Sequence, residues 1–189
     1  KDLGIGIALV DLYAKCGWLT QAQHMFDRLR DSDVIAWNVL IAGYAENGRG
    51  EEALECYRKM ELEGIPPDVV TFLYIVKACG SVGAIVKGKE VHMKLLEKGF
   101  ETNAHISNAL VDMYAKCGLL AEALEIFKEL HIHDVVSWTA LISGYVDHKL
   151  CKEALDCFDH MKLEGIAPNI ITFACSLRAC GSIGDIEKG

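Results

Sequence analysis

The sequence is short of the features that would place it quickly in a class of protein. It has only 3 prolines, and no apolar run approaches the roughly 18 residues that a membrane-spanning helix needs, so we expect no membrane partner. Positive charge is also scarce, because 19 Lys and Arg face 27 Asp and Glu. The resulting net charge of −8 argues against adhesion to nucleic acid by charge alone, although a locally basic groove stays open. With 51% hydrophobic residues, the chain has enough apolar material for a folded core, which excludes disorder.

What the sequence does contain is a repeat with a period of 101 residues. When the chain is shifted against itself by that distance, 41 of the 88 overlapping positions are identical. Variants of one Asp-Val-Val-Thr-Phe boundary begin at Asp33, Asp68, Asp134 and Asn169. We therefore expect a single repeat array over 1–189, cut after each Asp or Asn into units 3–33, 34–68, 69–103, 104–134 and 135–169, with a truncated sixth unit at 170–189.

Each unit has the apolar spacing of a helical hairpin. In the second unit, Trp37, Leu40, Ile41 and Tyr44 follow the i, i+3, i+4, i+7 stripe of a first helix, and a second stripe begins after the break at 47–48. Glycines at 64, 99 and 165 are placed to close second helices in the left-handed conformation. The residues expected to cap the first helices that follow are Thr71, Ser137 and Thr172.

One such hairpin cannot bury its apolar stripe alone, so neighbouring hairpins must stack. The predicted fold is all-α: an α-solenoid of helix-turn-helix hairpins that forms a right-handed superhelix, with first helices on the concave side. The positions of Trp37, Leu40, Tyr44 and Ala53 fit the spacing of tetratricopeptide repeats, which would make the chain a helical scaffold for protein or peptide partners.

Longer motifs resemble a different family. These are the Gly-Ile-x-Pro-Asp-Val-Val-Thr-Phe junction at 64–72, its copy at 165–173, the Trp-Asn/Thr-x-Leu-Ile-x-Gly-Tyr helices at 37–44 and 138–145, and Asn-Ala-Leu-Val-Asp-Met-Tyr-Ala-Lys-Cys-Gly at 108–118. Together they closely resemble pentatricopeptide repeat proteins over essentially the entire chain. The alternation of 31 and 35 residues is similar to the plant PLS subclass, with short units at 3–33 and 104–134, standard units at 34–68 and 135–169, and long units at 69–103 and 170–189.

The resemblance implies sequence-specific binding of single-stranded RNA, one base per repeat, in a mitochondrion or chloroplast. It also implies a role in organellar RNA processing or in recognising C-to-U editing sites, with organellar editing-factor proteins as further partners. An organellar leader is not seen in these residues, and neither end has the polar face of a capping unit, so we expect the natural protein to be longer.

By the family's pattern, the fifth and last residues of each unit read one base. These pairs are Ile7/Asp33, Asn38/Asp68, Leu73/Asn103, Asn108/Asp134 and Thr139/Asn169, followed by Ala174 in the truncated unit. Asn with Asp is similar to a uracil reader and Thr with Asn to an adenine reader, whereas Ile7 and Leu73 depart from the pattern. The favoured RNA is then 5′-N-U-N-U-A-3′. A competing interpretation treats the same residues as solvated polar groups and as helix N-terminal charges.

Two further sets of residues follow from the same resemblance. The second residue of each unit would sandwich the base: Ile35, Val70, Val136 and Ile171, with Gly4 and His105 as departures. Lys15 and Lys116 stand where the family has a phosphate-contacting lysine. A simple helix C-terminal charge explains these two lysines about as well.

Motifs that suggest other chemistry fail on inspection. Six of the eight cysteines are paired by the 101-residue period and form no Cys-x-x-Cys, so buried thiols are expected. The P-loop spacing from Gly83 to Lys89 has Glu90 where Mg²⁺ needs Ser or Thr. His131 and His133 form only a weak metal motif, and the His-x-Glu and Cys-x-x-Cys elements of a cytidine deaminase are missing. We expect no cofactor, no metal and no catalysis, so the chain is not predicted to be an enzyme.

Overall fold

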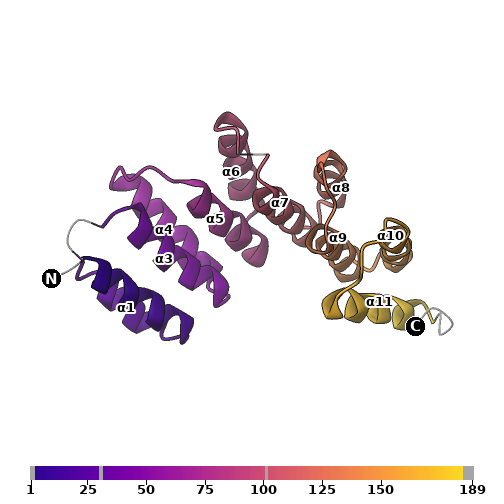
Figure 1. The fold of residues 1–189 in the computed structure, drawn as a ribbon, viewed down its shortest axis with the longest axis horizontal. Coiled ribbons are helices and arrows are strands. Elements are labelled where there is room, and N and C mark those ends of the chain that lie inside the picture. The colour runs from indigo at the N-terminus through magenta and orange to yellow at the C-terminus, as the bar shows by residue number, and fades with distance from the viewer. Residues whose placement is uncertain (1–2, 30–31, 101, 185–189) are drawn as a thin grey trace. The chain divides into compact units, whose positions relative to one another are not determined.

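The computed structural model describes residues 3–29, 32–100 and 102–184, and within these ranges all regular structure is α-helical (Figure 1). The chain divides into two compact units, Lys1–Phe100 and Glu101–Gly189. The first unit contains α1 (Leu3–Lys15), α2 (Leu19–Phe26), α3 (Val34–Glu46), α4 (Gly50–Leu62), α5 (Val69–Val82) and α6 (Ile85–Glu97). The second contains α7 (Ala104–Lys116), α8 (Leu120–Glu129), α9 (Val135–Asp147), α10 (Cys151–Leu163) and α11 (Ile170–Ile183).

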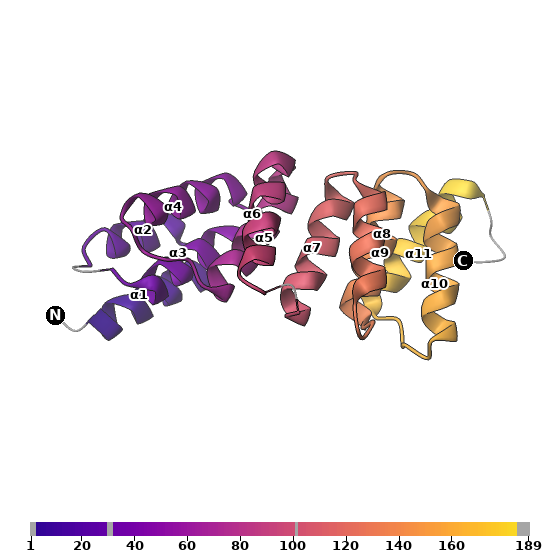
Figure 2. The same ribbon diagram turned by 90° about the horizontal axis from the view of Figure 1, so that it is seen from above.

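Inside each unit the helices form stacked hairpins in two layers. The first helices α1, α3 and α5 pack against one another in chain order, and α7, α9 and α11 do the same in the second unit. Each second helix packs on the first helix of its own hairpin, and α2, α4, α8 and α10 also pack on the first helix that follows (Figure 2). The predicted all-α array of hairpins is confirmed within each of the two compact units, while the exact boundaries of the repeats stay a prediction. No described helix is long and apolar enough to cross a membrane.

The ends of the second helices follow the expected glycines. Gly64, Gly99 and Gly165 have φ values of 73°, 69° and 75°, which is the left-handed conformation that a glycine adopts at little cost. The apolar residue after each one then donates its N–H back into the last turn, as Ile65 does to the Met60 carbonyl at 3.1 Å. Because these signals are local, the sequence placed them correctly.

The caps of the first helices differ from the sequence expectation. Asp68, Asp134 and Asn169 are the N-caps of α5, α9 and α11, and their side chains accept backbone N–H groups of the first turn. Thr71, Ser137 and Thr172 lie three residues further on, where their hydroxyls accept the N–H of the capping residue and complete a capping box. Choosing the hydroxyl residues as caps was therefore wrong. The usual capping box begins with the hydroxyl residue, but in these three boxes the acidic or amide residue stands first.

Successive first helices approach closely at a repeated glycine. A Cβ built on Gly43 would lie 2.6 Å from the Cβ of Ala14, and one built on Gly144 would lie 2.5 Å from the Cβ of Ala115. Real Cβ atoms essentially never come so close. The packing of α1 on α3, and of α7 on α9, therefore requires glycine at these two positions.

Candidate nucleic-acid interface

Two Asn–Asp pairs lie at the same place in two different repeats. Asn38, in the second turn of α3, donates through Nδ2 to Oδ1 and Oδ2 of Asp68 at 2.9 and 3.1 Å. Asn108, in the second turn of α7, donates in the same way to Asp134 at 3.2 and 3.0 Å. Both carboxylates cap the first helix of the next hairpin, so the stacking of hairpins brings each fifth residue to the last residue of its unit.

The third polar pair is joined through another residue. Thr139 Oγ1 donates to the Val135 carbonyl at 2.6 Å and lies 2.8 Å from Thr172 Oγ1. Thr172 Oγ1 in turn lies 2.9 Å from Asn169 Oδ1. Thr139 and Asn169 are thus linked through the hydroxyl of Thr172, a residue that the sequence indicated only as a helix cap.

The remaining pairs lack a polar fifth residue, as the sequence indicates. Asp33 and Asn103 serve as N-caps, since Asp33 accepts the N–H of Ala36 at 2.9 Å and Asn103 accepts that of His105 at 3.0 Å. Their unit partners Ile7 and Leu73 are apolar and half-buried, and Ala174 at the equivalent place in α11 is exposed. In these three units the side chain of the fifth residue therefore has no donor or acceptor to present to a base.

Hydrogen bonding lowers the pKa of the two paired carboxylates. Burial alone would raise the pKa of Asp68, but hydrogen bonds from the Thr71 N–H and the Asn38 amide outweigh burial and lower it. The pKa of Asp134 is lowered for the same reason, with burial opposed by the Ser137 N–H and the Asn108 amide. At neutral pH both groups are acceptors only. The helix-capping interpretation is satisfied too, so these residues serve the fold whether or not they read a base.

Beside these buried polar groups lie exposed apolar side chains. Asn38 and Asn108 are each 8% exposed, whereas Ile35, Val136 and Ile171 are 56–57% exposed and Val70 is 41% exposed. A single exposed apolar residue needs no explanation, but the same position is exposed in four units. His105 and Gly4, the two departures, are exposed as well. The second residue of each unit is therefore exposed and does not pack in the core.

The two lysines are engaged at the ends of their helices. Lys15 Nζ lies 2.6 Å from Asp11, and Lys116 Nζ lies 2.7 Å from Asp112, one turn earlier on the same exposed helix surface. Their phosphate-contacting role stays a prediction. The same unit position is occupied by Glu46 in α3 and by Asp147 in α9, which the resemblance did not indicate. They accept hydrogen bonds from Tyr74 and Arg178 at 3.1 and 2.9 Å. Counting positions from each unit boundary would have found these acidic residues.

Comparison with known proteins decides the family. The model of the PPR repeat family matches residues 32–81 and 133–182, and that of the PPR repeat matches 8–34 and 106–135. The chain belongs to the pentatricopeptide repeat family. Two Arabidopsis thaliana relatives, both chloroplastic pentatricopeptide repeat-containing proteins, are 43% and 38% identical over 94% and 100% of this chain, which covers 34% and 23% of their lengths. The chain thus spans about a third or less of these relatives.

The fold agrees with a solved pentatricopeptide repeat structure. Over 98% of this chain, and 29% of the other, it superposes with a TM-score of 0.81 and 21% identity on the pentatricopeptide repeat protein PPR10 in complex with an 18-nt psaJ RNA element. At that identity the likeness concerns the fold alone. The plant PLS subclass stays a prediction.

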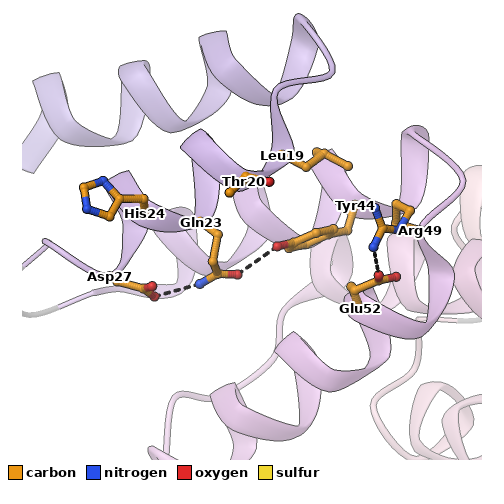
Figure 3. A pocket seen from close by; sticks show the side chains of 8 residues that line it. All are labelled: Leu19, Thr20, Gln23, His24, Asp27, Tyr44, Arg49 and Glu52. Carbon is orange, nitrogen blue, oxygen red and sulfur yellow. Dashed lines mark hydrogen bonds and ion pairs between the residues drawn. The ribbon is translucent and has the colours of Figure 1, made fainter.

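A pocket lies away from the paired residues of this pentatricopeptide repeat chain. It is open, has a volume of about 330 Å³, and lies between α2, α3 and α4 (Figure 3). Gln23 joins the Tyr44 hydroxyl at 3.0 Å to Asp27 at 2.7 Å, while Arg49 pairs with Glu52. One period later, Leu124 stands in place of Gln23 and Lys128 in place of Asp27, so the polar lining is not a feature of the repeat. We assign it no function.

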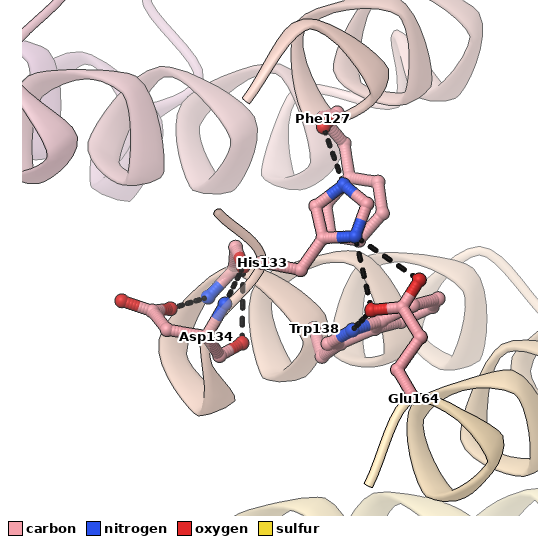
Figure 4. Close-up of polar contacts among 6 residues, drawn as sticks. Phe127, His133, Asp134, Trp138 and Glu164 are labelled. Carbon is pink, nitrogen blue, oxygen red and sulfur yellow. Dashed lines mark hydrogen bonds and ion pairs between the residues drawn. The ribbon is translucent and has the colours of Figure 1, made fainter. Parts of the chain in front are cut away.

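The motifs that suggested other chemistry are structural. His133 stacks on Phe127 with ring centroids 4.1 Å apart, and its two nitrogens lie 3.1 Å from the Phe127 carbonyl and 3.0 Å from Glu164, which also accepts from Trp138 (Figure 4). No cluster of His, Cys, Asp and Glu suited to a metal occurs among the described residues. Gly83 is the left-handed cap of α5, so the P-loop spacing spans a helix end. Of the six cysteines paired by the period, three are buried as expected (Cys56, Cys79 and Cys180), two are half-buried (Cys117 and Cys157) and Cys16 is exposed.

Proposed function

We propose that this pentatricopeptide repeat segment binds single-stranded RNA with sequence preference, reading one base per repeat. The observation that supports this best is the identical placement of Asn38/Asp68 and Asn108/Asp134, each beside an exposed apolar residue. The presence of RNA in the PPR10 complex supports the choice of ligand. Helix capping alone would explain the two carboxylates but not the amide held against each one.

The chemistry of each pair suits one base. Asp68 and Asp134 are acceptors, and each asparagine adds an amide with a second N–H and a carbonyl oxygen. Uracil presents an N3–H donor between two carbonyl acceptors, which such a pair complements. Thr139 with Asn169 offers the amide that can pair with the donor and acceptor edge of adenine. With the family's parallel polarity, the preferred sequence is 5′-N-U-N-U-A-3′.

Contacts other than charge would carry much of the affinity. The exposed Ile35, Val70, Val136 and Ile171 would hold the flat faces of the bases by apolar contact, which any base can make. Lys15 and Lys116 are the proposed phosphate contacts, but each is already paired with an aspartate. The chain's net charge of −8 adds no general attraction for RNA.

The cellular role is proposed from the relatives. Two of them are chloroplastic, which supports action in an organelle, either chloroplast or mitochondrion. There the segment would select sites for RNA processing or C-to-U editing, without catalysis of its own, and organellar editing-factor proteins would act on the bound RNA.

Titration of the 189-residue chain with labelled RNA tests the proposal. RNAs containing UNUA and scrambled controls are compared at several salt concentrations, with NMR shifts as the readout so that weak binding is measured. We expect UNUA to bind more tightly, with a preference that persists at moderate salt, because base contacts do not depend on counterion release. Equal binding of all sequences, lost as salt rises, would contradict base reading. No binding at any salt, with capture of helical peptides instead, would favour a protein-binding scaffold.

A further inference from the structure

The third residue of a unit contacts the fifth residue of the unit before it. Thr71, the third residue after the boundary at Asp68, lies with Oγ1 only 2.6 Å from Asn38 Oδ1 and is completely buried. Thr172 makes the equivalent contact with Thr139 at 2.8 Å. These residues lie 33 positions apart in the chain, so the contact exists only because successive hairpins stack.

Ser137 occupies the same position but behaves differently. Its hydroxyl donates to the Asp134 carbonyl at 3.0 Å, and among the described residues it has no hydrogen bond to Asn108. Thr71, Ser137 and Thr172 all accept the N–H of their capping residue, at 3.1, 3.0 and 3.2 Å, so the capping box is the same in each case. Capping therefore does not account for the extra contact that the threonines make.

The difference follows the residue type and the contact that the hydroxyl makes. Both threonines at this position lie against the fifth residue of the preceding unit, whereas the serine donates to the backbone carbonyl of its own capping residue. As a result Asn38 is held at both ends of its amide, with Nδ2 on Asp68 and Oδ1 on Thr71. Within the described part of the chain, Asn108 has hydrogen bonds at the Nδ2 end of its amide alone.

We propose that Thr71 is a positioning residue for base selectivity, acting through Asn38, and that Thr172 acts likewise on Thr139. This inference rests on the proposed function. Uracil and cytosine differ at N3, which carries a hydrogen in uracil and a lone pair in cytosine. The plane and direction of the asparagine amide decide which of the two is matched. Unit 34–68 therefore selects uracil over cytosine more strongly than unit 104–134, although both have the Asn–Asp pair.

The test is a substitution in each unit, measured on the 189-residue chain with RNAs that carry U or C at one position. Thr71→Val keeps the shape and removes the hydroxyl, so the preference for U at the second nucleotide should fall about threefold to tenfold, the size of one neutral hydrogen bond. The preference at the fourth nucleotide should not change. Ser137→Ala is the matched control: it removes a capping-box hydroxyl of α9 and lowers the melting temperature similarly, but leaves selectivity at the fourth nucleotide intact.

The reverse substitution keeps the test decisive if Thr71→Val folds poorly. Ser137→Thr should raise the preference for U at the fourth nucleotide above that of the unaltered chain. A preference at the second nucleotide that is unchanged in Thr71→Val, or equal losses at both nucleotides, would overturn the positioning role while leaving base reading in place. An unaltered chain without preference at either nucleotide would instead refute the proposed function itself.

Discussion

The Asn108 amide donates to both carboxylate oxygens of Asp134, at 3.2 and 3.0 Å, and the same carboxylate caps helix α9. One side chain thus serves the fold and the candidate reading site together. A useful substitution here must change the pattern of donors and acceptors without removing the cap. Asn meets that condition, since it caps helices about as well as Asp.

Exchanging this pair for its neighbour tests the code. The double substitution Asn108→Thr with Asp134→Asn copies Thr139/Asn169 and should move the preference at the fourth nucleotide from uracil to adenine. A mismatch should cost roughly 1 to 3 kcal/mol, as for other base-edge contacts. Adding Ser137→Thr, which copies Thr172, should strengthen the new preference. Competition binding against four RNAs that differ at that base is the measurement, and an unchanged uracil preference would show that the fifth and last residues do not read it.

The paired aspartates make the free energy of unfolding depend on pH in the acidic range. Because the pKa values of Asp68 and Asp134 are lowered in the fold from the ordinary 3.8, their contribution is complete above that value and is lost as the pH falls through the folded pKa. We expect Asp68→Asn with Asp134→Asn to lose less stability between pH 6 and pH 3 than the unaltered chain. Urea unfolding at the two pH values measures this. Equal losses would mean that the two carboxylates contribute nothing to acid sensitivity.

The lysine at the end of α7 is tested by salt dependence. If Lys116 contacts a phosphate, Lys116→Ala should weaken matched and scrambled RNA alike and reduce the salt slope by about 0.7, the value for one single-strand contact. Lys162 is the control, because it is an exposed lysine paired with Asp159 at 2.9 Å on the second helix α10. Slopes that stay the same in Lys116→Ala would identify this residue as a helix-end charge alone.

Two helical glycines should respond to alanine with opposite signs. Gly144→Ala would press a methyl group against Ala115 and should destabilise the chain by about 1 to 3 kcal/mol through overpacking. Gly181 in α11 has nothing within 4 Å of an added Cβ, so Gly181→Ala should stabilise it by roughly 0.5 to 1 kcal/mol through helix propensity. Denaturant midpoints give both values. A stable Gly144→Ala protein would mean that α7 and α9 can move apart easily.

A lysine occupies a turn that the preceding copy builds with glycine. Lys149 follows α9 with φ of 63°, and one period earlier Gly48 follows α3 with φ of 72°. A side chain in this left-handed conformation costs roughly 1 kcal/mol. Lys149→Gly should therefore raise the melting temperature, and Gly48→Lys should lower it. The loss in Gly48→Lys would come from the backbone conformation alone, because no atom lies within 4 Å of a Cβ at this position. Thermal unfolding of the two variants compares the copies directly, and shifts of the same sign would contradict the conformational explanation.

The helices and their ends were largely predictable because their signals are local. The apolar stripe from Trp37 to Tyr44 and the glycine at 64 lie within one or two turns of the structure that they specify. The sequence indicated the wrong residues as N-caps, although the signal is local. Asp68 and Thr71 each supply a group to the same capping box, and the sequence does not show which of the two is the cap. The acidic Glu46, at the unit position of Lys15, was missed although unit counting shows it.

The sequence by itself determined the repeat, the hairpins and the candidate residues at the fifth and last positions, since periodicity and spacing are written along the chain. Only the tertiary structure decided which polar groups meet. Asn38 reaches Asp68 and Thr71, whereas Asn108 reaches Asp134 and not Ser137. These partners lie 26 to 33 residues apart, and a hydrogen bond tolerates only a few tenths of an ångström. The packing of α3 on α5, the close docking of α7 on α9 at Gly144, and the direction in which one hydroxyl points settle these distances, and a pattern of residue types shows none of them.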